Sequence, residues 1–555
     1  MNRSLRSGAA LTALVLGIAG HAQRYLTEVF TSDQVTITSD VVYGTNIDFL
    51  RSNLATPNLV AEITELQTAV TLGNPIPAPY FNPTDASTGL KVTNVQMDIY
   101  APPTDEVTER PVVLYLHTGN ALPPPLNGSP TGTRKDSTAV ETCMRFARRG
   151  YVAVSMSYRL GWNPLADTEQ QRRGQLLNAI YRAIHDVRQC VRNLKANAAT
   201  YGIDPDKIVV YGEGTGGYIA LANATLDRPA ELFIEKFRPD PFNASVSYID
   251  TTQVGNLSGF NGNLALYRPN GQSHETHFCV NTGGALADST WLEAGDVPMV
   301  AFHTVFDPFA PFSNGIVIVP TTGGPVVPVS GSNVFMEFVN EYGNNSSFAT
   351  LPDGDPFTDR ARALYGSTQT HGSNNVTINT NVEGLFPMVR PQWPAPALEE
   401  ASPWQWWDPN SAAAQAVVSP GPPPITAHVA SLASNPDMSA AKGRAYIDTI
   451  QGYLNPRIVC ALQLGPCSLV GIDEDSEVAQ GVDVFPNPAT DRVTFTSTNS
   501  AILTYEVYDV NGRLVRTAQV NNNTAVMDRE GLKAGAYSVQ LRLKEGNVVR
   551  KLMLD

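Results

Sequence analysis

Apolar runs that suit buried strands alternate with helical segments through the middle of the chain. The run PVVLYLH, from Pro111 to His117, is continuously apolar and bounded by turn residues, which is typical of a strand buried on both faces. The helical segment STAVETCMRFARRG, the strand YVAVSMSYR, a long helix from Gln175 and the strand KIVVYG follow it. Consecutive strands that are joined through helices run parallel. We therefore predict an α/β fold, in which helices cover both faces of a mostly parallel sheet.

The pattern extends on both sides of this segment. Upstream, VTNVQMDIYAP alternates apolar and polar residues, which predicts an antiparallel strand at the edge of the sheet. Downstream, HFCVNTGG and VPMVAFHTVFD are apolar runs that end in polar loops, and SAAKGRAYIDTIQGYL reads as a closing helix. Sites on such sheets form at the carboxyl ends of the strands, where His117, Gly214 and Asp307 fall.

The first 22 residues read as a signal peptide. Arg3 and Arg6 precede the apolar core AALTALVLGIA, which is too short to span a bilayer. Gly20 and Ala22 are the small residues that cleavage after Ala22 requires; an ordinary buried helix is the alternative. No other long apolar run is present in the sequence, so we expect no transmembrane span.

The rest of the chain is long enough for more than one domain. Its length of 555 residues exceeds the usual size of a single domain. We predict an α/β domain over residues 23–468, an acidic linker over 469–481 and a small β-sandwich over 482–555. Short alternating strands, separated by turn pairs at 511–512 and 545–546, indicate the sandwich. The net charge of −14 argues against nucleic acid as a partner, because phosphate binding needs a basic surface.

Five cysteines can form disulfides if the protein is exported. Cys460 and Cys467 are close in the sequence, so we predict that they pair. Cys143 and Cys190 lie on two predicted helices and could form a second bridge, which the sequence alone does not decide. Cys279 lies in an apolar strand and is expected to be a buried thiol. No C-x-x-C motif or histidine cluster is present, so neither a metal site nor a cofactor is predicted.

The C-terminal residues resemble a type A sorting domain of type IX secretion cargo. The matching pieces occur in order, FPNP from Phe485, YDVNGR from Tyr508, LKAGAY from Leu532 and the basic-apolar end RKLML. The resemblance implies export to the periplasm, transfer by the type IX machinery across the outer membrane, and a secreted or cell-surface location. An accessory β-sandwich without an address function is the alternative.

The larger part, from about Val92 to Leu462, resembles the α/β-hydrolase fold in its carboxylesterase and feruloyl-esterase-like branch. The resemblance rests on LYLHTGN, an HGG-like loop, on SYRLGW, on DPDKIVVYGEGTGGY and on PMVAFHTVFDPFAPF. It implies a nucleophile elbow with the pattern G-x-S-x-G and a triad of serine, acid and histidine. Fold similarity alone does not establish activity, so each site residue must be considered separately.

The elbow has a glycine, Gly214, where the family has its nucleophilic serine. Glycine cannot attack a substrate. Thr215 is the alternative nucleophile, although a shift of one residue would turn its side chain away from the family direction. The amides of Thr118, Gly119 and Thr215 can still form an oxyanion hole.

The other two triad positions are assigned from the resemblance. Asp307 matches the acid. His428 lies shortly before the last helix, where the family's histidine falls, and His371 is the second choice; either could instead be a solvated loop histidine. His117 is expected to order its loop, as its family counterpart does.

Two further clusters favour structural roles. The tryptophans of WQWW, from Trp404, are expected to pack a long loop in preference to stacking on a sugar or aryl group. Asp353, Asp355 and Asp359 have a calcium-like spacing without the full EF-hand pattern, so a surface turn is favoured.

Three functions remain open from the sequence. The first is a secreted protein of esterase lineage that lacks the serine and acts in binding, with an ester or glycan ligand, or as a structural surface protein. The second is an active ester hydrolase that uses Thr215 or another nucleophile. The third is an extracellular matrix protein that self-associates.

Overall fold

The structure is a computed structural model that describes residues 24–351, 354–391, 393, 399–465, 467, 481–498, 500–509, 514–544 and 547–554. The predicted signal peptide and all but the last residue of the predicted linker lie outside these residues. The chain divides into two compact units. The larger runs to Thr350 and from Phe357 to Pro466, and the smaller comprises the residues from Cys467 onward with 351–356.

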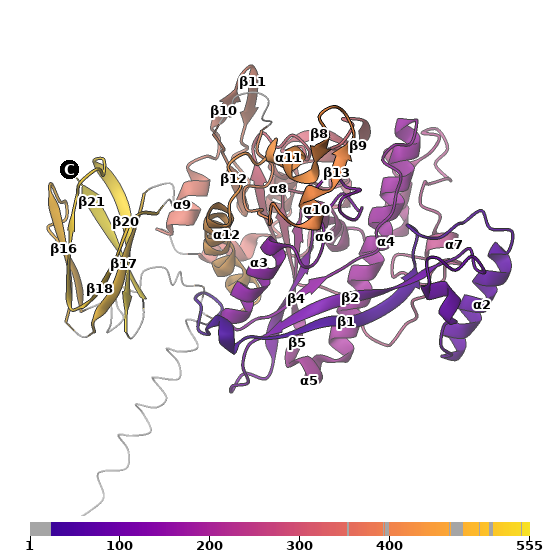
Figure 1. The fold of residues 1–555 in the computed structure, drawn as a ribbon, viewed down its shortest axis with the longest axis horizontal. Coiled ribbons are helices and arrows are strands. Elements are labelled where there is room, and N and C mark those ends of the chain that lie inside the picture. The colour runs from indigo at the N-terminus through magenta and orange to yellow at the C-terminus, as the bar shows by residue number, and fades with distance from the viewer. Residues whose placement is uncertain are drawn as a thin grey trace, which may run out of the picture. The chain divides into compact units, whose positions relative to one another are not determined.

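An eight-stranded sheet forms the centre of the larger unit (Figure 1). Its order is β1-β2-β4-β3-β5-β6-β7-β12. Strand β2 is antiparallel to both of its neighbours, and all pairs from β4 to β12 are parallel. This is the α/β-hydrolase arrangement. The strands are β1 (Thr36–Ile47), β2 (Val92–Ala101), β3 (Arg110–Leu116), β4 (Val152–Met156), β5 (Ile203–Glu213), β6 (Phe278–Thr282), β7 (Met299–Thr304) and β12 (Leu385–Met388).

The sequence predicts the direction of β2 correctly but not its place. We expected this strand at the edge of the sheet, and that expectation is wrong, because β1 pairs with it along its outer side. Six of the ten β2 residues are buried, whereas the first five of β1 are exposed. The polar, solvated edge belongs to β1.

Helices cover both faces of the sheet. Val112, Leu114 and Leu116 face the side where α4 and α6 pack. Their neighbour Tyr115 stacks on Tyr211 on the opposite side, where α3 contributes Phe146. The helices are α2 (Leu59–Leu72), α3 (Ser137–Arg148), α4 (Glu169–Ala196), α5 (Ala198–Tyr201), α6 (Thr215–Thr225), α7 (Thr251–Val254), α8 (Ser332–Glu341), α9 (Pro356–Arg362), α10 (Ala412–Gln415), α11 (Ala427–Leu432) and α12 (Ala440–Ala461).

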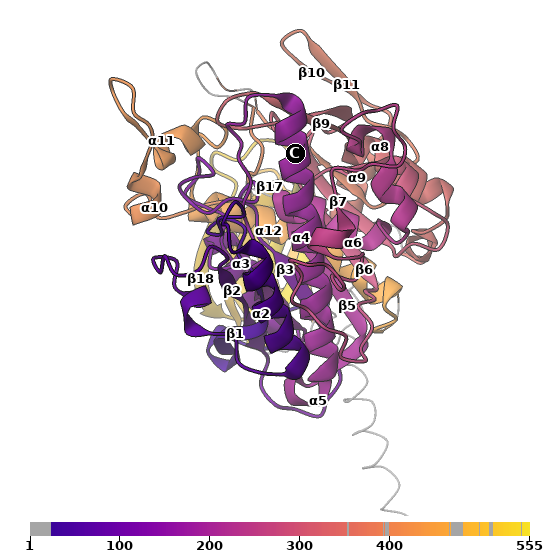
Figure 2. The ribbon, with the colours of Figure 1, turned by 90° about the vertical axis from the view of Figure 1, so that its right-hand side faces the viewer.

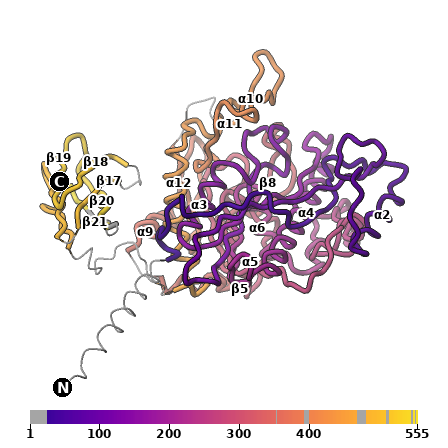
Figure 3. Tube along the Cα trace, turned by 60° about the horizontal axis from the view of Figure 1, so that its bottom comes forward, coloured from indigo at the N-terminus to yellow at the C-terminus, as the bar shows by residue number. Residues whose placement is uncertain are grey.

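Three hairpins are added to this framework. The hairpin of β13 and β14, which lies between α10 and α11 in the chain, forms with these two helices a segment that projects from the larger unit (Figure 2 and Figure 3). The hairpins are β8 (Asn314–Ile318) with β9 (Pro325–Ser330), β10 (Thr368–His371) with β11 (Asn374–Thr377), and β13 (Val417–Ser419) with β14 (Ile425–Thr426).

Two antiparallel sheets, β15-β16-β19 and β18-β17-β20-β21, make up the C-terminal unit. Their inner faces share one core, in which the rings of Phe495 and Tyr505 lie 5.2 Å apart. The predicted β-sandwich is confirmed; its two predicted turn pairs lie outside the described residues. The strands are β15 (Val482–Phe485), β16 (Arg492–Ser497), β17 (Ile502–Asp509), β18 (Leu514–Asn522), β19 (Thr524–Asp528), β20 (Gly535–Leu543) and β21 (Asn547–Leu554).

The cysteines follow the predictions in part. Cys460 and Cys467 are disulfide-bonded, as predicted. The alternative second bridge is wrong, because Cys143 and Cys190 are free and buried, and the sulfur of Cys190 lies 3.7 Å from that of Met97. Cys279 is a buried free thiol, as expected. No helix in the described part of the chain is both long and apolar enough to cross a membrane.

Candidate functional site

The turn between β5 and α6 keeps the shape of a nucleophile elbow. Gly214 connects the two elements with φ +54° and ψ −115°, a backbone conformation in which a side chain is strained. A Cβ atom on Gly212 would overlap the carbonyl of Gly216, so the turn closes only with glycine there. The strand, tight turn and helix of the G-x-S-x-G motif are therefore present without the serine.

The side chain of Thr118 occupies the space that a serine at this turn would need. A Cβ atom built on Gly214 would overlap Oγ1 of Thr118 and lie 3.0 Å from its Cβ. In the HGG-like loop of the family the corresponding residue is a glycine, as the resemblance implies. The elbow thus carries no side chain at position 214, and the loop that faces it carries a hydroxyl.

Three backbone amides that the sequence assigns to an oxyanion hole belong to residues that line this place. The N–H groups of Thr118, Gly119 and Thr215 have no acceptor among the described residues, and Thr215 is the first residue of α6. The side chain of Thr215 holds the facing loop, because its Oγ1 accepts a hydrogen bond of 2.7 Å from the amide of Asn120. A helix N-terminus favours a negatively polarised oxygen, so these amides suit a carbonyl or carboxylate oxygen.

Asp307 lies just after β7, and its side chain is 3 % exposed. Its Oδ1 accepts hydrogen bonds from the amides of Phe309 and Ala310, at 2.8 and 2.9 Å. Its Oδ2 lies 3.7 Å from Nε2 of His303, a buried ring whose nitrogens face Ser332 and the carbonyl of Ala310. Burial raises the pKa of Asp307 to about 7, so the carboxyl is largely neutral in mildly acidic solution.

Neither of the two assigned histidines reaches this acid. His428, in α11, accepts a hydrogen bond at Nδ1 from Trp407, although a triad histidine donates from that atom to its acid. His371 pairs with Glu399. The histidine beside Asp307 is His303. The ring of Trp404 lies 3.3 Å from the position of a Cβ on Gly283, and Oδ2 of the acid lies 4.0 Å from the same point.

His117 has an ordering role, as the sequence suggests. Its Nδ1 lies 2.6 Å from the carbonyl oxygen of Thr118, and its ring stacks on Tyr158 with centroids 4.4 Å apart. The hydroxyl of Tyr158 donates to the carbonyl of His117. Burial lowers the pKa of His117 to about 4, so a neutral ring supports the loop that carries Thr118.

Glu213 is a site residue that sequence reasoning missed. It is buried at the end of β5 and accepts hydrogen bonds from Tyr115 (2.5 Å), Trp404 (2.9 Å) and Gln405 (2.7 Å). Burial raises its pKa. An acidic residue on an otherwise apolar strand signals such donors, because a buried carboxyl needs partners. The contact fixes the 401–407 loop against the elbow, and the predicted packing role of Trp404 is confirmed by its burial.

These residues surround a cavity of about 440 Å³. Thr118, Gly119, Gly214, Thr215 and Asp307 all line it, whereas His428 and His371 do not. Among the described residues of its wall there is no histidine, lysine, arginine or cysteine, and Asp307 is the only carboxylic acid. The cavity therefore combines hydrogen-bond donors with a mostly apolar wall and contains no general base of the histidine kind.

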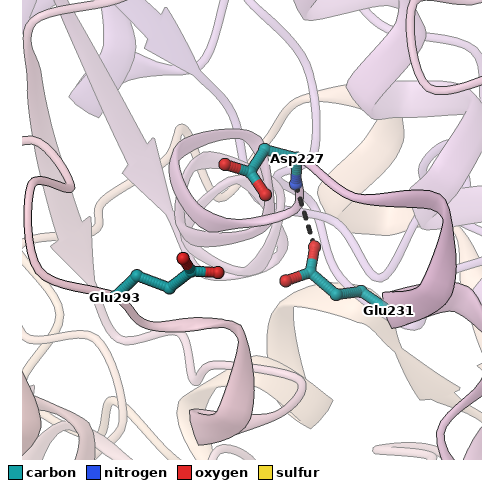
Figure 4. Close-up of side chains that lie close together, drawn as sticks. All are labelled: Asp227, Glu231 and Glu293. Carbon is teal, nitrogen blue, oxygen red and sulfur yellow. Dashed lines mark hydrogen bonds between the residues drawn. The ribbon is translucent and has the colours of Figure 1, made fainter.

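One acidic cluster lies elsewhere on the larger unit. The carboxylates of Asp227, Glu231 and Glu293 have ligand atoms within 4.8 Å of one another (Figure 4). Arg228 pairs with Glu231 at 2.7 Å and also with Glu293, and the amide of Asp227 donates to Glu231. The Arg228 guanidinium therefore already occupies two of the three carboxylates as an ion-pair partner. Of the calcium-like trio, Asp353 lies outside the described residues.

Comparison with known proteins agrees with this architecture. Residues 97–315 match the BD-FAE family, and residues 483–555 match the secretion system C-terminal sorting domain. The chain is 34 % identical over 86 residues to an endo-acting ulvan lyase from Formosa agariphila. The aligned residues make up 15 % of this chain and 17 % of that protein.

Solved structures of esterases are also similar. The propionate-bound esterase 2 of Thermogutta terrifontis is 18 % identical, with 40 % of this chain and 70 % of that chain covered and a TM-score of 0.25. An α/β hydrolase from a Medee basin deep-sea metagenome library is 16 % identical, with 39 % of this chain and 66 % of that chain covered and a TM-score of 0.23. The fold assignment rests on the strand order and the family match. The protein contains a BD-FAE esterase-like domain of the α/β-hydrolase fold and a C-terminal sorting domain that marks it for the secretion machinery and for a secreted or cell-surface location.

Proposed function

We propose that this secreted protein binds a carbonyl-containing ligand in its esterase-like cavity and does not hydrolyse it. In this proposal the protein has the scaffold, the amide donors and the cavity of an esterase. It does not carry out the covalent step, in which a serine oxygen attacks the carbonyl carbon.

The position of Thr118 carries this proposal. Its hydroxyl stands against Gly214, where the attacking side chain of an esterase projects. If only the serine had changed, the turn would be left with an open space that a water molecule could use. Here a side chain from the facing loop fills that space, which leaves little room for an attacking water molecule.

The absence of a histidine from the described residues of the cavity wall gives further support. A hydroxyl is a weak nucleophile unless a base removes its proton, and no histidine is found among the described wall residues. Thr215 is also poorly placed, since its oxygen accepts the hydrogen bond of Asn120. Loss of a triad serine costs on the order of a million-fold in turnover, and the remaining amides serve binding better than catalysis.

The test measures binding and chemistry in one sample. The full secreted chain is titrated calorimetrically with an alkyl ester, and the sample is then extracted and analysed by chromatography. We expect saturable binding and complete recovery of the intact ester. Consumption of the ester at a rate that scales with protein concentration would refute the proposal, and so would the absence of binding across a panel of alkyl and aryl esters.

A further inference from the structure

The cavity follows one face of α6 from its first residue to its end. Its wall includes Thr215, Tyr218, Ala222 and Leu226, which are spaced by three and four residues and therefore lie on one side of a helix. From Gly214 to Leu226 the rise is about 18 Å at 1.5 Å per residue. The cavity is thus a channel that runs along the helix, with the amide donors at its beginning.

Two walls of this channel are apolar. Helix α4 contributes one, and the segments after α6 with the β8–β9 hairpin contribute the other, while the segments 118–131, 401–407 and 418–435 add polar side chains to the cavity. The apolar residues of the two walls suit a hydrocarbon body. These residues are Leu176, Leu177, Ile180 and Ile184 on α4, Phe237 and Ile249, and Val317, Val326, Val327 and Val329 on the hairpin.

One polar group on the apolar wall has no partner. Trp291 lines the cavity and is 2 % exposed, and its ring meets that of Phe237 edge-on at 5.6 Å. Its indole N–H has no acceptor among the described residues. A buried donor without an acceptor is destabilising, so a ligand oxygen at this point would remove that cost.

We propose that the ligand is an elongated aliphatic carboxylic acid, or its ester, that carries a second oxygen on its chain. The carbonyl oxygen binds to the amides of Thr118, Gly119 and Thr215. The chain lies along α6, and its oxygen accepts the hydrogen bond of Trp291. This inference rests on the proposed binding function and adds the chemical class of the ligand.

The experiment uses the full secreted chain and calorimetric titration at pH 6. Probes are acetate, octanoate, dodecanoate and ω-hydroxy acids of the two longer chains. Affinity should rise about fourfold for each methylene that enters the channel, the transfer free energy of one CH₂ group. The Ala222→Phe variant, which places a ring in the channel beside α6, should weaken binding of dodecanoate far more than binding of acetate.

Trp291→Phe tests the second oxygen, because it removes the N–H and keeps an aromatic ring. We expect it to weaken binding of the ω-hydroxy acids three- to tenfold, the range of one hydrogen bond, without weakening the unsubstituted acids. Trp393→Phe is the matched control. It removes an indole N–H that also lacks an acceptor among the described residues, but Trp393 is not part of the cavity wall. This control should change neither the affinity for the ω-hydroxy acids nor the affinity for the unsubstituted acids.

The possible outcomes distinguish a failure of the proposed ligand class from a failure of the proposed binding function. Affinity that is independent of chain length, or a Trp291→Phe effect that is equal for both kinds of acid, overturns the ligand class. If the intact aryl and alkyl esters still bind without being consumed, the binding function stands. If p-nitrophenyl octanoate is hydrolysed by the same sample, the proposed function itself has failed, whatever the acids show.

Discussion

A serine at position 214 would have to share its space with the side chain of Thr118. The two residues face each other across the mouth of the cavity, one on the elbow and one on the loop after β3. Glycine suits the elbow because its φ is +54°, and threonine suits the facing loop because nothing projects from the elbow. At the scale of single residues, this pair of residues carries the proposal that the protein binds a carbonyl-containing ligand without hydrolysing it.

The first prediction concerns the cost of placing a serine at position 214. Gly214→Ser should lower the free energy of unfolding by about 2–4 kcal/mol, because it adds backbone strain and a steric overlap with Thr118. Gly214→Ser with Thr118→Gly should recover part of the loss, since it removes the overlap and leaves the strain. Urea unfolding of the larger unit measures both. Equal stability of the single and double variants would show that Thr118 does not restrict the site.

A second prediction at this scale concerns Asp307. Burial raises its pKa from 3.8 to about 7. Between these values the folded state keeps the proton that the unfolded state releases, so the stabilisation is present in acid and is lost as the pH rises towards 7. Asp307→Asn cannot ionise and can accept the same two amide hydrogen bonds through its Oδ1.

The free energy of unfolding of the Asp307→Asn variant should therefore match that of the wild type near pH 4 and exceed it at pH 8 by about 4 kcal/mol. Nearby His303 and Tyr218 titrate in both proteins, so their effects largely cancel in the difference. The measurement is urea unfolding of both proteins at several pH values. Parallel profiles from pH 4 to pH 8 would mean that Asp307 is not held neutral.

At the scale of elements, the 401–407 loop is fixed on the elbow through Glu213. This carboxyl receives three donors from β3 and from the loop. Glu213→Gln keeps the size but replaces one acceptor oxygen with a donor, so at least one buried donor loses its partner. We expect a loss of about 1–3 kcal/mol and faster amide hydrogen exchange in residues 401–407.

The matched control is Glu231→Gln, a buried carboxyl in the acidic cluster away from the cavity. It removes an acceptor oxygen in the same way but should leave exchange in the 401–407 loop unchanged. If both variants accelerate exchange in that loop equally, the loop depends on global stability and not on Glu213.

The sequence predicts the elements of the fold better than it predicts their partners. Strands such as PVVLYLH are determined by local composition, because a continuously apolar run can only be buried. The elbow, the acid and the donor amides follow from the family motifs. The contact of Thr118 with Gly214 and the contact of Trp404 with Glu213 could not be predicted, since they join segments 96 and 191 residues apart. The location of the histidines likewise depends on long loops without a periodic pattern.

At the scale of the whole molecule, the C-terminal unit is an address and the larger unit carries the cavity. The sorting domain matches residues 483–555 and has its own core. Deletion of the residues after Val482 should therefore leave the protein in the periplasm of a type IX-competent host. It should not change ligand binding by the larger unit. Undiminished secretion of the truncated chain, detected by immunoblotting of the medium, would refute the address function.

The claim that this scaffold binds without hydrolysis is tested most directly by its initial rate on p-nitrophenyl butyrate. The wild-type chain is compared with Thr118→Val and Thr215→Val, which remove the two hydroxyls nearest the elbow and keep their size. We predict that all three release nitrophenolate barely above buffer. A wild-type turnover in the usual enzymatic range, about one per second or more, that is lost in either variant would contradict the account and identify the nucleophile.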